Sequence, residues 1–166
     1  MMNWLSKALP TPKASRSAIG LMSGTSLDAL DACIVKENKE NHRIDVVNTQ
    51  RSELPIQARD GLQKIIESGE VNLDTLLHLE HQYTEAVIEQ CKMLIESSDE
   101  KISVIGFHGQ TLWHAPHLGS TLQIGFAERL AEATLTPVVH QFRRGDMARG
   151  GQGAPLAPLF HASQFG

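Results

Sequence analysis

The residues best suited to chemistry stand in three polar clusters, and the last of these contains a carboxylate in a glycine-rich setting. Asp146 lies among three arginines and is followed by Gly150, Gly151 and Gly153. A carboxylate beside such a loop is a candidate general base, and arginines suit phosphate or carboxylate groups on a substrate. The alternative is an exposed ion pair between Asp146 and Arg143 or Arg149, which would contribute little stability.

The first cluster, residues 23–31, separates two apolar runs and reads as the turn of a β-hairpin. Gly24 can take a positive φ and lets the backbone approach a ligand closely, so that successive N–H groups converge on phosphate oxygens. Asp28 and Asp31 could face a metal-bound phosphate. Three hydroxyls add donors without bulk: Ser23, Thr25 and Ser26. An ordinary β-turn, with these hydroxyls bonded to their own backbone, is the alternative.

The second cluster, residues 108–116, follows an apolar strand at residues 102–107. Ligands gather beyond the carboxyl ends of strands in open α/β sheets, so His108 and Gln110 are expected in a loop that binds a polar ligand. Metal binding by His108, His114 and His117 is the alternative. Their spacing matches no standard zinc pattern.

Hydrophobic periodicity predicts the elements that position these clusters. A hairpin over residues 19–35 and a third strand at 43–49 form an antiparallel meander. A helix begins near Pro55 and stops at Gly69, and Asn72 caps a longer helix with Leu73 and Leu77 on its apolar face. Further strands are expected at residues 102–107, 121–125 and 137–139, with a helix over 127–133.

Composition limits the chain to a single globular core. It has 166 residues, 41% of them hydrophobic, and a net charge of −4. Without a basic stripe, a nucleic-acid surface has little support. Cys33 and Cys91 are isolated in the sequence, which indicates a reducing compartment and a cytoplasmic protein. Prolines interrupt residues 1–17, where we expect a flexible leader, with neither a signal peptide nor a membrane span.

The clusters, taken in order, give the chain a recognisable pattern. It resembles the anhydro-N-acetylmuramic acid kinases, sugar kinases of the actin, hexokinase and Hsp70 superfamily. The resemblance spans residues 18–166 and rests on four motifs: residues 22–28, 106–114 with Pro116, 122–125, and Asp146 with 150–156. It implies an α/β fold, an RNase H-like (actin-like ATPase) lobe whose mixed sheet has an antiparallel meander followed by parallel strands with flanking helices. Residues 18–166 would then be the N-terminal lobe, ending before a second lobe.

The resemblance also implies roles for particular residues. Asp146 would be the catalytic base, and the hairpin would bind ATP with Mg²⁺ in place of a Gly-Lys-Ser/Thr P-loop, which the chain lacks. No separate set of metal ligands is assigned. The expected nucleotide-binding residues are Gly24, Thr25, Ser26, Leu27, Asp28, Ala29, Leu30 and Asp31. The expected sugar-binding residues are His108, Gln110, Arg143, Gly151 and Gln152. The chain departs from the usual family pattern at Ala29, Phe126 and Gln141.

The implied reaction is ATP-dependent phosphorylation of 1,6-anhydro-N-acetylmuramic acid with hydrolytic cleavage of the anhydro ring. It yields MurNAc 6-phosphate in murein recycling and amino sugar catabolism. The expected partners are the sugar and ATP, with no nucleic acid or membrane, and a homodimer in the full-length form. The first alternative is an inactive lobe that acts as a nucleotide- or sugar-binding or interaction module. A metal-dependent hydrolase using His108 and His114 is the second.

Overall fold

The computed structural model describes residues 16–38, 40 and 43–165, and a five-stranded mixed sheet forms its centre. The strand order is β3 (Ile44–Ser52), β2 (Leu30–Glu37), β1 (Ser17–Ser23), β4 (Ile102–Phe107) and β7 (Val138–His140). The first three strands pair antiparallel, whereas β1, β4 and β7 run parallel. The predicted meander followed by parallel strands is confirmed, and this strand order with these directions is the RNase H-like arrangement expected from the sequence.

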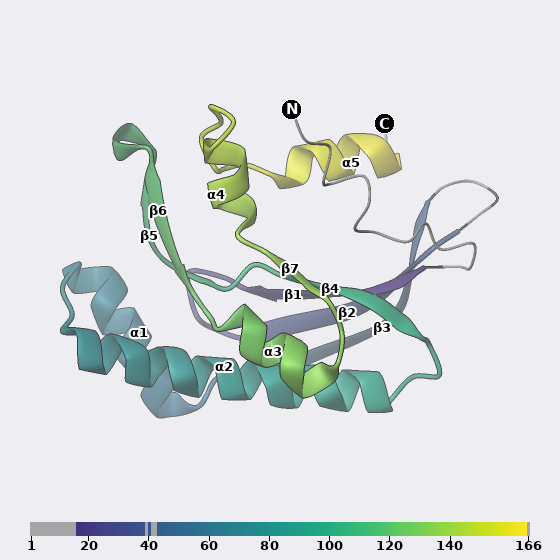
Figure 1. Cartoon of the computed structure of the whole chain (residues 1–166), viewed down its shortest axis with the longest axis horizontal. Helices are drawn as coiled ribbons and strands as arrows, with labels where there is room; N and C mark the ends of the chain where they lie inside the picture. The colour runs from purple at the N-terminus through teal and green to yellow at the C-terminus, as the bar shows by residue number, and fades with distance from the viewer. Residues whose placement is uncertain (1–15, 39, 41–42, 166) are drawn as a thin grey trace.

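Helices lie on both faces of this sheet. Figure 1 shows α1 (Ile56–Ser68), α2 (Leu73–Glu96) and α3 (Ala127–Thr134) along one face. On the other face lie α4 (Phe142–Met147) and α5 (Ala157–Phe165). A two-stranded ribbon rises beside α4; its strands are β5 (Gln110–Ala115) and β6 (Ser120–Ile124), joined by the 3₁₀ turn η1 (Pro116–Leu118).

The ends of the two long helices follow from local chemistry. Pro55 stands at the N-cap of α1, and Gly69 ends that helix at φ 69°, with its N–H donating to the carbonyl of Ile65. The Asn72 side chain accepts a 2.8 Å hydrogen bond from the Thr75 N–H and so caps α2. No helix among the described residues is long and apolar enough to cross a membrane.

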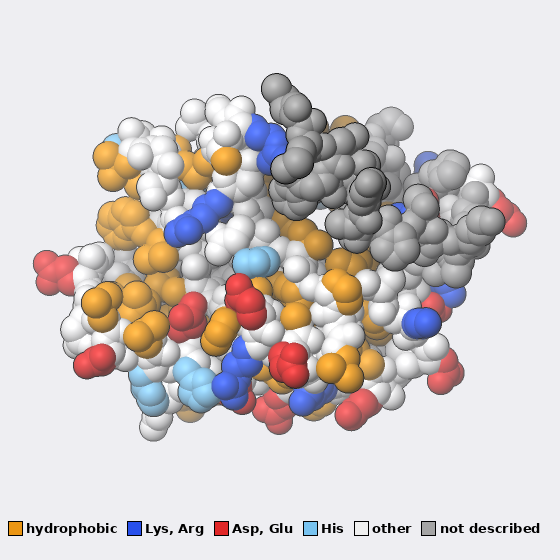
Figure 2. Space-filling view, viewed as in Figure 1, with side chains coloured by type: hydrophobic (Ala, Val, Ile, Leu, Met, Phe, Trp, Pro, Cys, Tyr) orange, Lys and Arg blue, Asp and Glu red, His pale blue; other side chains and the backbone are white. Residues whose placement is uncertain are grey.

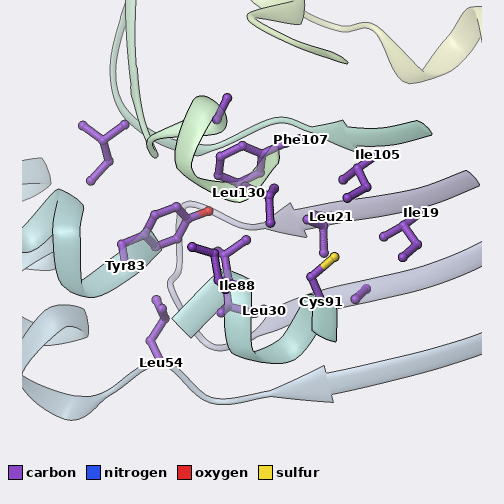
Figure 3. Close-up of a cluster of buried hydrophobic side chains, with 14 of the residues drawn as sticks. Ile19, Leu21, Leu30, Leu54, Tyr83, Ile88, Cys91, Ile105, Phe107 and Leu130 are labelled. Carbon is purple, nitrogen blue, oxygen red and sulfur yellow. The ribbon is translucent and has the colours of Figure 1, made fainter. Parts of the chain in front are cut away.

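The core lies between the sheet and α2 (Figure 3). Alternate residues of β1 and β2 point toward α2. Each buried aliphatic side chain contributes about 1.5–3 kcal/mol to the stability of the fold. Leu73 and Leu77 are not part of this core, since they are 74% and 61% exposed. The first turn of α2 precedes the stretch that packs against the sheet, whose first buried residue is Leu79. The prediction that Leu73 and Leu77 lie on the apolar face of this helix was therefore wrong.

The surface carries mixed charge. Figure 2 shows Lys and Arg side chains scattered among acidic ones on one face of the molecule. Cys33 and Cys91 are both free thiols.

Candidate functional site

The turn between β1 and β2, residues 24–29, presents unused donors. Its one internal backbone bond runs from the Leu27 N–H to the Gly24 carbonyl at 3.1 Å. Thr25, Ser26 and Asp28 are exposed, and among the described residues their N–H groups donate to no protein acceptor. Three free N–H groups and two exposed hydroxyls on one turn suit an anionic ligand.

The turn departs from prediction in its backbone. Gly24 does not have a positive φ; Leu27 does, at 57°. A Cβ on Gly24 would meet only ordinary contacts, the nearest being Ser26 Oγ at 3.5 Å. Leu27 is completely buried, and burial worth about 1.5–3 kcal/mol offsets the roughly 1–2 kcal/mol cost of the left-handed conformation. Any requirement for glycine at position 24 therefore comes from a ligand.

Ser23 also differs from prediction. Its hydroxyl is buried and lies 2.8 Å from the Tyr83 hydroxyl of α2, so it faces the core and not the turn's open side. The side chains of Leu27, Ala29 and Leu30 are buried as well, which leaves only their backbone for a ligand.

Asp31 points to the opposite face of the sheet from the core residues. It lines a pocket of about 550 Å³, together with Gly20, Met22, Cys33, Gly106 and Phe142. Its carboxylate lies 3.7 Å from Nε of Arg51, its partner on β3, and both side chains are well exposed. Such a pair has little intrinsic value and can yield to a stronger ligand. The sequence did not single out Arg51, which the β2–β3 register places opposite Asp31.

In the second cluster, His108 and Gly109 form a short link between β4 and β5. His108 Nδ1 lies 2.8 Å from the Gly109 carbonyl, so Nδ1 carries the proton and donates. Burial, with a smaller contribution from the Arg143 guanidinium, lowers the pKa of His108. Its Nε2 is buried and finds no partner in the described part of the chain. His108 is therefore a neutral imidazole with an unused acceptor.

Gln110 was expected in a loop, but it begins β5 and is completely buried. Its amide donates to the Thr111 carbonyl at 3.1 Å. Only two residues, His108 and Gly109, separate the end of β4 from Gln110. It can support neighbouring residues, but a ligand has no direct access to it.

A cavity of about 10 Å³, close to the space one water needs, lies beside His108. Gln123 and Gln141 line it, and each has a side-chain oxygen that is buried without a partner among the described residues. Gln123 was given no role of its own from the sequence. Its only local signal is an amide between two apolar residues of β6, Leu122 and Ile124.

In the third cluster, the glycine loop closes around Asp146. The Gly153 N–H donates to Asp146 Oδ2 at 2.7 Å. A Cβ at Gly151 would overlap Cγ and Oδ2 of Asp146 and lie 2.6 Å from Oδ1. The described residues supply no donor to Oδ1. One carboxylate oxygen is thus fixed while the other can accept a proton.

The arginines hold backbone carbonyls and do not pair with Asp146. Arg143 Nη1 donates to the Gly153 carbonyl at 2.9 Å, and Arg149 Nη1 donates to Gly145 at 2.9 Å. Within residues 43–165, no arginine forms an ion pair with Asp146. Arg143 and Asp146 instead hold the two sides of Gly153. The ion-pair alternative is not what the structure contains.

Gly151 and Gln152 are exposed beside this carboxylate. The structure therefore brings Asp146, Arg143, Gly151 and Gln152 together, with His108 close enough for Arg143 to influence its pKa. No group of three or more His, Cys, Asp and Glu side chains that could hold a metal occurs in the described residues.

Comparison with known proteins identifies one family. The sequence model of the family described as anhydro-N-acetylmuramic acid kinase matches residues 16–166. Curated proteins of that name from Acidiphilium cryptum and Hydrogenovibrio crunogenus are 44% and 39% identical over 153 and 155 residues. The matches cover 88% and 92% of this chain but only 40% and 42% of those relatives. The chain thus spans about two fifths of their length.

Among solved structures, a Ppx/GppA family member from Aquifex aeolicus matches at 14% identity with a TM-score of 0.37. The match covers 80% of this chain and 38% of that one.

Proposed function

The chain belongs to the anhydro-N-acetylmuramic acid kinase family, and on that premise we propose that it carries the phosphate-binding turn and the general base of such an enzyme. The proposed reaction transfers phosphate from ATP to 1,6-anhydro-N-acetylmuramic acid while water opens the anhydro ring. MurNAc 6-phosphate results, as murein recycling and amino sugar catabolism require. The observation that best supports this proposal is the geometry of the Asp146 carboxylate: the Gly153 N–H fixes Oδ2, and Oδ1 is free to accept a proton.

The bonding changes explain why a single base suffices. Water forms a bond to C1 as the C1–O6 bond breaks, and O6 forms a bond to the γ-phosphorus as ADP leaves. Because phosphoryl transfer captures O6, no general acid is needed for that leaving group. Asp146 Oδ1 accepts the proton from water. Gly151 and Gly153 keep the carboxylate in place for this step.

The β1–β2 turn is proposed to bind the ATP phosphates through the N–H groups of Thr25, Ser26 and Asp28. Mg²⁺ commonly binds through one or two carboxylates plus substrate phosphates, and the exposed carboxylates of Asp31 and Asp28 fit that donor set. These two residues would hold the ion. When bound, it neutralises phosphate charge.

The sugar is proposed to lie beside the third cluster. Gly151 and Gln152 are exposed next to Asp146. Arg143 fixes the loop through the Gly153 carbonyl, and neutral His108 lies close to Arg143. Gln110 would act by supporting the ribbon.

Product analysis in ¹⁸O-labelled water tests the proposal. With ATP, Mg²⁺ and the anhydro sugar, the protein should form MurNAc 6-phosphate carrying one ¹⁸O at C1. Phosphorylated sugar without ring opening would contradict the role of Asp146. Binding of sugar and ATP without turnover would identify a binding module, and ring opening without ATP would identify a hydrolase.

A further inference from the structure

Two buried polar side chains of α2 reach the two ends of the β1–β2 turn. The Tyr83 hydroxyl lies 2.8 Å from Ser23 Oγ, and Gln90 Nε2 donates to the Leu30 carbonyl at 2.8 Å. Tyr83 and Gln90 are each 1% exposed. Ser23 and Leu30 are cross-strand partners and close the turn, because one ends β1 and the other begins β2.

The spacing of Tyr83 and Gln90 in the sequence matches the period of an α-helix. Seven residues are two turns, so Tyr83 and Gln90 lie on the same face of α2, about 10.5 Å apart along its axis. Gln90 also donates to the Gln50 carbonyl of β3 at 3.2 Å, and the Tyr83 ring stacks on Phe107 with centroids 6.3 Å apart. Figure 3 shows Tyr83 reaching from α2 into the core beneath Phe107. Both side chains are held on several sides.

A polar group in the core is costly unless it is hydrogen-bonded, and an apolar side chain would fill the same space at lower cost. Most other buried residues on this face of α2 are apolar, including Leu79, Val87 and Leu94. Of the polar exceptions, Thr84 bonds to Glu80 and Phe126, whereas Tyr83 and Gln90 bond to the two residues that close the turn. The turn they hold contains Leu27 in its strained conformation.

We propose that Tyr83 and Gln90 are positioning residues that fix both ends of the turn, so that its free N–H groups are preorganised for a nucleotide phosphate. This inference rests on the proposed function, in which that turn binds ATP. Preorganisation raises affinity by lowering the cost of ordering the turn on binding.

Isosteric variants test the two anchors separately. Tyr83→Phe keeps the ring and removes the hydroxyl, and Gln90→Met keeps the length and removes the donor. Each should raise the Kd for ATP about fivefold while the Kd for the anhydro sugar stays unchanged. Ser17→Ala is the matched control, since it removes a buried hydroxyl hydrogen bond at the opposite end of β1. Ser17→Ala should lower the melting temperature about as much as Tyr83→Phe and Gln90→Met do, but its Kd for ATP should stay that of wild type.

A double variant separates the hydrogen bond from general packing. Ser23→Ala and Tyr83→Phe remove the two sides of one bond, so the double variant should weaken ATP binding no more than either single one. Additive losses would contradict action through this bond.

Hydrogen exchange of the Leu27 amide, which donates to the Gly24 carbonyl within the turn, reads the anchors without any nucleotide. Exchange there should be faster in Tyr83→Phe and Gln90→Met than in wild type or Ser17→Ala. If exchange and ATP affinity in the two variants match the control, the inference is overturned. If wild type binds no ATP, the proposed function fails and the nucleotide role fails with it, whereas faster exchange in the variants would still support anchoring of the turn.

Discussion

Gly151→Ala should damage the proposed catalytic base without removing it. The added methyl group would overlap Cγ and Oδ2 of Asp146 and approach Oδ1 to 2.6 Å, where ordinary contact begins at 3.4 Å. Asp146 has a short side chain whose Oδ2 accepts from the Gly153 N–H, so it cannot move away and keep that bond. The carboxylate must shift by about 1 Å, a misplacement that costs roughly 100-fold in rate.

Gly145→Ala is the matched control. It adds the same methyl group within α4, where the nearest atom to the new Cβ is Arg149 Nη1 at 3.8 Å. A helical Gly→Ala change adds about 0.5–1 kcal/mol of stability, whereas overpacking at Gly151 costs about 1–3 kcal/mol. Activity must therefore be compared at a temperature where both variants are folded.

The assay is steady-state turnover of ATP and anhydro sugar, with both Kd values measured by calorimetry. Gly151→Ala should lower kcat about 100-fold, and Gly145→Ala should keep wild-type turnover. Wild-type kcat in folded Gly151→Ala would refute the reasoning, because the base would then tolerate displacement.

Three other predictions follow from the structure. Gly24→Val should weaken ATP binding about tenfold with little change in melting temperature, since the nearest protein atom to a new Cβ is 3.5 Å away; unchanged affinity in a titration would exclude close phosphate approach. Burial lowers the pKa of His108, so the unfolded chain binds its proton more tightly, and thermal stability should decline as pH falls below about 6.5. His108→Gln should flatten that decline. Burial raises the pKa of Tyr83, so stability should fall as pH rises above about 10, and less so in Tyr83→Phe.

The fold was largely predictable because its signals are local. Pro55, Gly69 and Asn72 mark the helix ends, and the alternation in β2 places Leu30 and Ala32 on the buried face. The β5 strand was missed, because the buried polar residues at its start break the apolar alternation from which a strand is inferred.

The site was predictable only in part, since its geometry depends on tertiary contacts. The glycines at 150–153 indicated a close backbone approach, but Gly151 makes room for Asp146 itself. At the turn, Leu27 and not Gly24 takes the positive φ, because burial of the leucine outweighs the strain. Tyr83 lies 60 residues from Ser23 in sequence, and no local pattern indicates that contact.

Asp146→Asn tests the central claim most directly, because it keeps the size of the side chain and an acceptor for the Gly153 N–H while it removes the base. With ATP and anhydro sugar in a protein that binds both, kcat should fall by about 100-fold or more while both Kd values change little. Turnover near that of wild type would contradict the account and exclude Asp146 as the group that activates water.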